Sequence, residues 1–448
     1  MDWERLREKV LDRVYPEKDE LQRARQMYGR ISSYIEDEHG FETHFAGSTS
    51  RSTCMSGDKD IDIFVLFPED VPRKDLEERG LTVGKSVFRE FDGEYEVEYA
   101  EHPYTKGEIE GQEVEVVPCY DTSPEDITSA VDRTPHHSRW VQNNLDSEQK
   151  KDVVLLKQFL KSHGLYGSSL RVRGFSGYLC EVLVSHYGSF RELVEAAEDW
   201  REAEVIDPED HHEALPERLE EKFGGEMLRV VDPVDPERNV ASVLSDENFS
   251  EFIFTCWRFN SSPGMEFFEA DEPEYDRFEL EQEIGERGDF IVVEFENPDE
   301  VDDVVYPQMR KTLRTLRKQL EKNDFQVYES GFHVGERTRL FFELDAELSG
   351  IEDVKGPKVF HGTDHLEQFT RKYDTVFIRG TRLYAKTRRD YTHARELVKD
   401  FLDGEPNELH ERGVPNHVAE KIAEFRLTDP VQEDEKWLNY LAEKLNVT

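Results

Sequence analysis

Two carboxylates on one expected strand, preceded by a small turn, are the residues of this chain whose spacing could do chemistry. Asp60 and Asp62 open an apolar stretch over residues 60–67, and eleven residues separate the Gly47-Ser48 pair from Asp60. Side chains i and i+2 of a strand share a face, so both carboxylates can hold cations from the same side. Gly47 lets the backbone approach a phosphate, and Ser48 adds a hydroxyl and an N–H. The pattern indicates phosphoryl or nucleotidyl transfer from a nucleoside triphosphate.

Chemistry of this kind uses two metal ions that lie roughly 3.5–4 Å apart. A third carboxylate, from a neighbouring strand, normally completes the set of ligands. Glu115 is the candidate, and Glu113 on the same face is its rival. An Asp-x-Asp pair alone, in a chain this acidic, is more often a solvated strand edge. The Gly-Ser turn upstream and the apolar strand downstream favour a metal site, and Arg51 adds a positive charge at the turn.

The elements that must position these residues are read from hydrophobic periodicity. A Pro- and Gly-broken acidic stretch over 263–290 predicts a domain boundary. Before it we expect helices over 4–14, 19–37, 148–163 and 175–198, the strand 60–67, and a strand pair, 94–104 and 108–118, turned at Lys106-Gly107. Beyond it we expect a strand over 290–295, a helix over 307–322, a hairpin over 325–344, a strand over 375–385 and C-terminal helices.

Composition describes a folded and very acidic chain of 448 residues with a formal net charge of −43. Aromatic content of 11% excludes an acidic disordered protein, which would contain few aromatics. Acid spread along the whole chain favours adaptation to a salty cytoplasm, where a Debye length of about 3 Å at 1 M screens repulsion from polyanions. The cysteines, far apart and in apolar sequence, predict buried free thiols. With no signal peptide and no membrane span in the sequence, we expect a soluble, cytoplasmic protein.

Several longer strings make a resemblance specific. The turn and the two aspartates resemble the DNA polymerase β-like nucleotidyltransferase superfamily. Further strings look more specifically like the archaeal, class I CCA-adding enzymes (tRNA nucleotidyltransferases), strongly over roughly the first 260 residues and beyond them by order of elements. These strings are YAEHPY (99–104), VEVVPCY (114–120), AVDRTPHH (130–137), RGFSGYLCE (173–181) and DPVDPERNVA (232–241).

The resemblance implies an α+β, multidomain enzyme: a nucleotidyltransferase head with a mixed sheet (1–138), a mostly helical central neck domain (139–265), and a C-terminal α/β body and tail that binds tRNA (266–448). It implies untemplated addition of C, C and A to the 3′ end of tRNA from CTP and ATP, with two Mg²⁺ ions and release of pyrophosphate. The implied partners are the acceptor and T arm of tRNA, and a second copy of the chain in a homodimer.

The resemblance also implies residue roles. Asp60, Asp62 and Glu115 fall on the family's metal carboxylates, although the third of these is more often Asp. The remaining positions are Gly47, Ser48 and Arg51 at the nucleotide-binding turn, His137, Lys157 and Tyr166 at the triphosphate, and Arg238 at the base. Taken singly, His137 would be a surface histidine, Lys157 part of a solvated helix face, and Tyr166 a core aromatic.

Local charge points to where RNA would bind. Residues 310–322 hold six basic residues and one acid, and residues 371–389 hold seven and one, in a chain with nearly twice as many acids as bases. Such islands suit a duplex backbone recognised by shape; the first would also suit an amphipathic helix with Leu313, Leu316 and Leu320 facing inward. The candidate RNA-binding residues are Arg310, Arg314, Arg317, Arg379, Arg382, Lys386 and Arg388.

Two other functions remain open at this point. One is a different untemplated RNA nucleotidyltransferase, similar to a poly(A) polymerase or an oligoadenylate synthetase. The other is a catalytically inactive RNA-binding scaffold, against which the candidate carboxylates Asp60, Asp62 and Glu115 argue.

Overall fold

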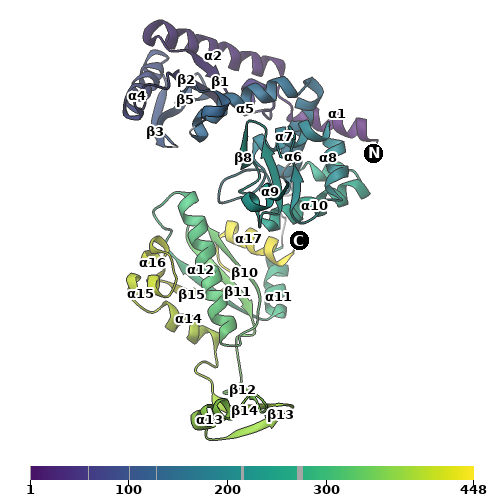
Figure 1. The fold of residues 1–448 in the computed structure, drawn as a ribbon, viewed down its shortest axis with the longest axis vertical. Coiled ribbons are helices and arrows are strands. Elements are labelled where there is room, and N and C mark those ends of the chain that lie inside the picture. The colour runs from purple at the N-terminus through teal and green to yellow at the C-terminus, as the bar shows by residue number, and fades with distance from the viewer. Residues whose placement is uncertain are drawn as a thin grey trace. The chain divides into compact units, whose positions relative to one another are not determined.

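The chain forms two compact units, an N-terminal unit over residues 1–271 and a C-terminal unit over 272–448 (Figure 1). In this computed structural model the described residues are 2–58, 60–99, 101–127, 129–212, 216–269 and 276–447. Each unit is described by itself. The α+β class expected from the sequence is confirmed, since both units combine sheets with helices.

A five-stranded sheet in the order β1-β2-β5-β4-β3 organises the first part of the N-terminal unit. Strands β2 and β5 are parallel, and the other neighbours are antiparallel. Helices α2 and α4 cover one face through a core that includes Ile61, Ile63 and Val114. The elements are α1 (Trp3–Val14), α2 (Lys18–His39), β1 (Thr43–Phe45), α3 (Gly47–Arg51), β2 (Asp60–Phe67), α4 (Arg73–Glu90), β3 (Glu94–Tyr99), β4 (Pro103–Ile109) and β5 (Gln112–Tyr120).

The strand pair expected over 94–104 and 108–118 was wrong, because three strands occupy this segment and Lys106-Gly107 lies inside β4. The turn between β4 and β5 falls at Glu110-Gly111, both with positive φ (51° and 78°), as a tight hairpin turn requires. Gly107 serves a different purpose. A Cβ there would lie 1.9 Å from the carbonyl oxygen of Glu94 on β3, so the glycine permits close strand approach.

Helices make up most of the remainder of the N-terminal unit. The helix expected over 175–198 is two helices, because Gly188 ends the first and Ser189 caps the second through the N–H of Glu192. The elements are a 3₁₀ turn (Pro124–Asp126), α5 (Ala130–Asn144), α6 (Ser147–Ser162), α7 (Gly177–Tyr187), α8 (Phe190–Ala197), β6 (Glu204–Ile206), α9 (Pro216–Phe223), β7 (Leu228–Asp232), β8 (Asp235–Asn239), α10 (Asp246–Ser261) and a second 3₁₀ turn (Met265–Phe267).

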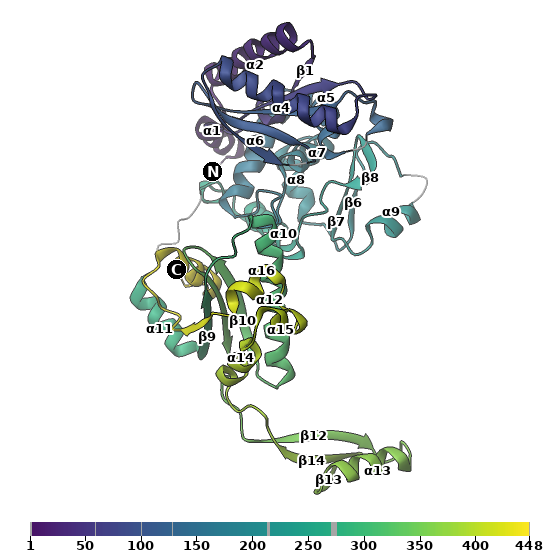
Figure 2. The same ribbon diagram turned by 90° about the vertical axis from the view of Figure 1, so that its left-hand side faces the viewer.

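The C-terminal unit is built on a four-stranded sheet in the order β10-β11-β9-β15 with helices on both faces (Figure 2). Helix α12 packs on one face through Leu316 and Leu320, as expected, and α17 packs on the other through Trp437. The elements are α11 (Arg277–Arg287), β9 (Asp289–Phe295), α12 (Asp302–Lys322), β10 (Val327–Val334), β11 (Thr338–Leu344), α14 (Ala394–Leu402), α15 (Pro406–Glu411), α16 (Asn416–Ile422), β15 (Arg426–Thr428) and α17 (Glu435–Leu445).

A second small sheet in this unit contains β12 (Ile351–Lys358), β14 (Arg382–Arg388) and β13 (Val376–Arg379), with α13 (Thr363–Lys372) beside it. The single strand expected over 375–385 was therefore wrong, since Gly380 in a left-handed conformation turns the chain between β13 and β14.

Two further expectations can be compared with the structure. Cys54, Cys119, Cys180 and Cys256 are all buried and unpaired, as the sequence predicted. Among the described residues, no helix combines the length and the apolar character needed to cross a membrane.

Phe159 on α6 gives a direct test of the core that positions the site. Its fully buried ring packs against Phe190, Phe259 and Phe268. We expect Phe159→Ala to lower the free energy of unfolding by about 3–5 kcal/mol, the usual cost of removing a buried phenylalanine ring. Urea denaturation at constant salt measures it. Lys161→Ala on the exposed side of the same helix is the control, and a loss below about 1 kcal/mol for Phe159→Ala would contradict this packing.

Candidate active site

The carboxylates predicted from the sequence come together because β2 and β5 are parallel and in register. Asp60 pairs with Glu113, and Asp62 pairs with Glu115. Paired residues on adjacent strands point to the same face about 4.8 Å apart, so four carboxylates lie on the face opposite α2 and α4. Glu115 lies beside Asp62 and Glu113 beside Asp60, which keeps both glutamates in reach of the pair.

The Gly-Ser turn is in direct contact with one of these carboxylates. Gly47 begins the short helix α3, and the N–H of Ala46 donates to the carbonyl oxygen of Asp62 at 2.9 Å. Gly47 has a φ of +71°, and a Cβ there would lie 1.6 Å from Oδ2 of Asp62. Only glycine fits at this point, so the turn and the carboxylate belong to one site.

The carboxylates affect one another's ionisation. Burial, followed by the charges of Glu115 and Asp60, raises the pKa of Asp62 to about 7. The pKa of Asp60 is also raised, first by burial and then by Glu113. Oxygen donors of this kind are the ligands that Mg²⁺ prefers, and a divalent cation would relieve their repulsion. The donor set therefore fits the metal expected from the sequence.

Lys106 is one residue of this site that the sequence did not predict. It pairs with Glu115 across β4 and β5, and its Nζ lies 2.9 Å from Oε1 of Glu115 and also contacts Glu113. The two carboxylates raise the pKa of the lysine. Within the described ranges, no three acidic, histidine or cysteine side chains converge closely enough to enclose a cation. The alternation of residues around Lys106 is typical of a strand and could have placed the lysine beside Glu115. The glycine that follows it favours a turn instead.

Arg51 and Lys157 lie inside the protein, behind the turn. The Nε of Arg51 donates to Oε1 of Glu181 at 2.9 Å, and a second guanidinium nitrogen donates to Ser138 at 2.9 Å. The ammonium of Lys157 donates to the carbonyl oxygen of Thr53 at 2.7 Å. Burial alone would raise the pKa of Glu181, but the two cations outweigh it and hold that pKa below its ordinary value.

Tyr166 lies near the same point, at the start of α7. A Cβ on Gly177 would meet the Tyr166 hydroxyl at 3.2 Å and the Lys157 ammonium at 3.5 Å. Ser176 caps this helix by accepting a hydrogen bond from the N–H of Leu179. The structure therefore brings Lys157 and Tyr166 together at a helix N-terminus, where the dipole favours anions.

His137 and Arg238 meet at a buried carboxylate, Asp232. Its Oδ2 accepts from Nε2 of His137 at 2.9 Å and from Arg238 at 2.7 Å. Its Oδ1 accepts from the Tyr178 hydroxyl at 3.2 Å, and the Tyr178 ring stacks on His137 with ring centres 3.8 Å apart. Burial opposes ionisation, but the hydrogen bonds from His137, Val234 and Arg238 lower the pKa of Asp232 to about 2. Because Tyr178 follows Gly177, this cluster adjoins the one around Lys157.

Glu181 and Asp232 were also missing from the predicted site, although both lie in strings that the sequence analysis quoted. An acidic residue among apolar neighbours signals a buried, paired carboxylate. Its partner cannot be read from the string, since Arg51 and Glu181 are 130 residues apart.

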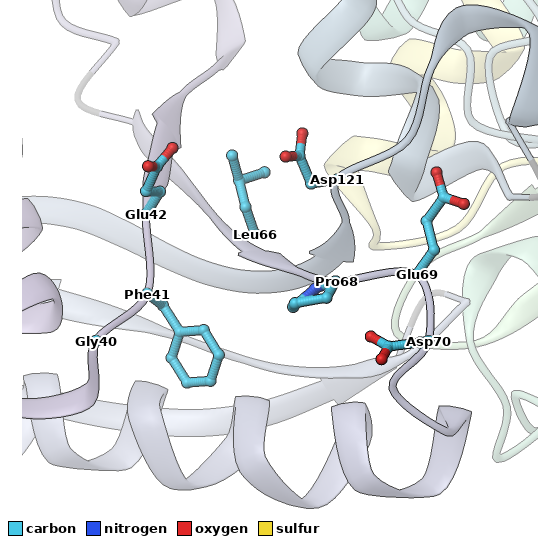
Figure 3. Close-up of a pocket in the computed structure, with 8 residues that line it drawn as sticks. All are labelled: Gly40, Phe41, Glu42, Leu66, Pro68, Glu69, Asp70 and Asp121. Carbon is cyan, nitrogen blue, oxygen red and sulfur yellow. The ribbon is translucent and has the colours of Figure 1, made fainter.

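A cavity of about 640 Å³ lies away from these residues, at the opposite end of β2 (Figure 3). Figure 3 shows Leu66 between the carboxylates of Glu42 and Asp121. Glu69 and Asp70 also line it. None of these lining residues is basic, so nothing among them would offset the charge of a triphosphate, and the cavity is not a candidate for the nucleotide.

The candidate RNA-binding residues lie on two elements of the C-terminal unit. On α12, Arg317 donates to Glu321, Ser330 and the backbone of Val327, and Arg314 donates to the carbonyl oxygen of Arg310. In the small sheet, Arg382, Lys386 and Arg388 are an even number of positions apart on β14 and so share one face of the strand. Lys386 and Arg388 are exposed. Arg379 pairs with Asp353 and lies over the rings of Phe377 and Tyr384.

The chain is similar to known protein families and to individual relatives. Three family models match in chain order: a nucleotidyltransferase domain (residues 30–137), the second domain of tRNA nucleotidyltransferase (151–269) and the C-terminal domain of CCA-adding enzymes (287–428). The CCA-adding enzyme of Methanocaldococcus jannaschii is 38% identical over 93% of both chains. That of Archaeoglobus fulgidus is 37% identical over 95% of this chain and 94% of its own, and that of Halobacterium salinarum is 44% identical over 73% and 70%. The chain therefore belongs to the family of CCA-adding enzymes.

Proposed function

We propose that this enzyme completes the 3′ end of tRNA by adding C, C and A from CTP and ATP. The tRNA 3′-hydroxyl oxygen forms a bond to the α-phosphorus of the nucleotide, the bond from that phosphorus to the bridging oxygen breaks, and pyrophosphate leaves. The observation that carries the proposal is the register of β2 and β5, which sets Asp62 and Glu115 side by side against the Gly47 turn.

Asp60, Asp62 and Glu115 would hold Mg²⁺, with Glu113 next to them. When bound, the metal supplies activation of the attacking hydroxyl and stabilisation of charge on the leaving phosphate. The protein's part is to fix carboxylate oxygens on two rigid strands. Rigid strands hold such groups more accurately than loops do, and that accuracy contributes directly to the rate.

The triphosphate would lie between the turn and the start of α7. Ser48 offers a hydroxyl and backbone N–H groups at the N-terminal end of the turn. The side chains of Lys157, on α6, and Tyr166, which follows α6, approach Gly177 at the start of α7, next to the His137 cluster. Arg238, held by Asp232, is the proposed contact to the base. For Arg51, the contacts with Glu181 and Ser138 favour support of the turn from behind.

The C-terminal unit is the proposed site for the acceptor and T arm of tRNA. Exposed Lys386 and Arg388 on β14, and exposed Arg314 and half-buried Arg310 on α12, place positive charge in an otherwise acidic chain. A duplex backbone is recognised by such charge and by shape, without reading sequence. We also propose that the enzyme acts as a homodimer, on the family resemblance alone.

Arg51 allows a test of the support for the turn. We expect Arg51→Met to lower the free energy of unfolding by about 3–5 kcal/mol, because the buried Glu181 would lose its ion-pair partner. Arg30→Met is the matched control, since Arg30 pairs with Glu110 at the surface and an exposed pair contributes about 0–1 kcal/mol. Urea denaturation of both variants gives the comparison. Equal losses in the two variants would show that the buried pair does not support the turn.

The reaction itself is tested with tRNA lacking its terminal CCA, Mg²⁺ and each nucleoside triphosphate in turn. We expect incorporation of C, C and A only, and a loss of at least about a hundredfold in Asp60→Ala, Asp62→Ala and Glu115→Ala, because the metal contributes several kcal/mol to such reactions. Glu90→Ala, an exposed acid at the end of α4, is the control. Incorporation of UTP or GTP, a poly(A) product, or full activity of Asp60→Ala would refute the proposal.

A further inference from the structure

Lys106 lies where a cation that binds the carboxylate face would have to go. On β4 it pairs directly with Glu115, and its ammonium contacts both Glu115 and Glu113. The lysine side chain is one-third exposed, and that of Glu115 is 23% exposed, so the pair is shielded on most sides. This is a contact within the sheet, between neighbouring strands whose register is fixed.

The contact divides the carboxylates of this face into two kinds. Glu113 and Glu115 have the ammonium of Lys106 as counter-ion, whereas in the described part of the chain Asp60 and Asp62 form no ion pair. An ammonium and a divalent cation compete for the same carboxylate oxygens. While Lys106 holds Glu115, the ammonium occupies an oxygen that Glu115 would need to complete a set of three ligands with the two aspartates, in agreement with the absence of such a set among the described residues.

We propose that Lys106 is an internal counter-ion that holds Glu115 in the metal-free enzyme and is displaced when a divalent cation binds. Lys106 is thus a positioning residue that sets the affinity of the cation site. The inference rests on the cation site of the proposed function. Without Lys106, like charges on adjacent strands would repel one another whenever the site is empty, since opposed like charges destabilise a sheet. With it, metal binding must break an ion pair, so the cation binds more weakly than four carboxylates alone would bind it.

The sign of the effect separates this role from an ordinary structural ion pair. If Lys106 only stabilised the sheet, its removal would loosen Glu115 and leave metal affinity unchanged or reduced. If it competes with the cation, its removal tightens metal binding, and the effect depends on Glu115.

Mn²⁺ binding to the full-length protein, followed by titration calorimetry and by the paramagnetic resonance signal of free Mn²⁺, tests the inference without any turnover. We expect Lys106→Met to bind Mn²⁺ about tenfold more tightly than the unmodified protein, because a positive charge within contact distance of the site is removed. Lys74→Met is the control, since it removes the same charge from an exposed pair on α4. In a Glu115→Gln background, the gain from Lys106→Met should shrink to less than about half, measured as a double-mutant cycle.

Lys106→Gln should follow Lys106→Met, and Lys106→Arg should follow the unmodified protein, which keeps the test valid if one variant does not fold. Unchanged or weaker Mn²⁺ binding in the folded neutral variants, with binding retained by the unmodified protein, would overturn the role of Lys106 alone. Absence of Mn²⁺ binding in every variant and in the unmodified protein would overturn the cation site itself.

Discussion

The parallel pairing of β2 with β5 is the constraint on which the rest of the site depends. Its register places Asp62 beside Glu115 and leaves the apolar alternate residues to pack against α2 and α4. A shift by one residue would turn every one of these side chains to the other face, exposing the core and burying the acids. The hydrophobic core and the carboxylate face are therefore two consequences of one register, and the like-charge repulsion on that face is offset by the burial behind it.

Two buried carboxylates organise what surrounds this face. Glu181 on α7 holds Arg51 at the end of the turn, and Asp232 at the end of β7 holds His137 and Arg238. Both lie where an unpaired charge would be costly, so each fixes its basic partners in one place. Three of the seven nucleotide-binding residues expected from the sequence, Arg51, His137 and Arg238, are thus held by acids, and the chain's large excess of acid is used inside it as well as on its surface.

Local pattern predicted most elements, because the apolar spacing of strand 60–67 and of the helices over 4–14 and 148–163 is strong and unbroken. It failed where two glycines offer a turn: the sequence pattern favours Gly107, whereas Glu110 and Gly111 form the turn. That single error placed Lys106 in a loop and hid its contact with Glu115. The partners of Arg51 and His137 were out of reach for another reason, since pairs separated by about a hundred residues leave no periodic trace in a single sequence.

The central claim is that the register of β2 and β5 builds one divalent-cation site against the Gly47 turn. Anomalous diffraction from crystals of the full chain grown with CTP and Mn²⁺ tests it most directly. The account predicts manganese peaks within coordination distance of Asp60, Asp62 and Glu115, with the triphosphate on the turn. Manganese bound only elsewhere, for example at the acidic cavity lined by Glu42 and Asp121, with these three carboxylates uncoordinated, would contradict it.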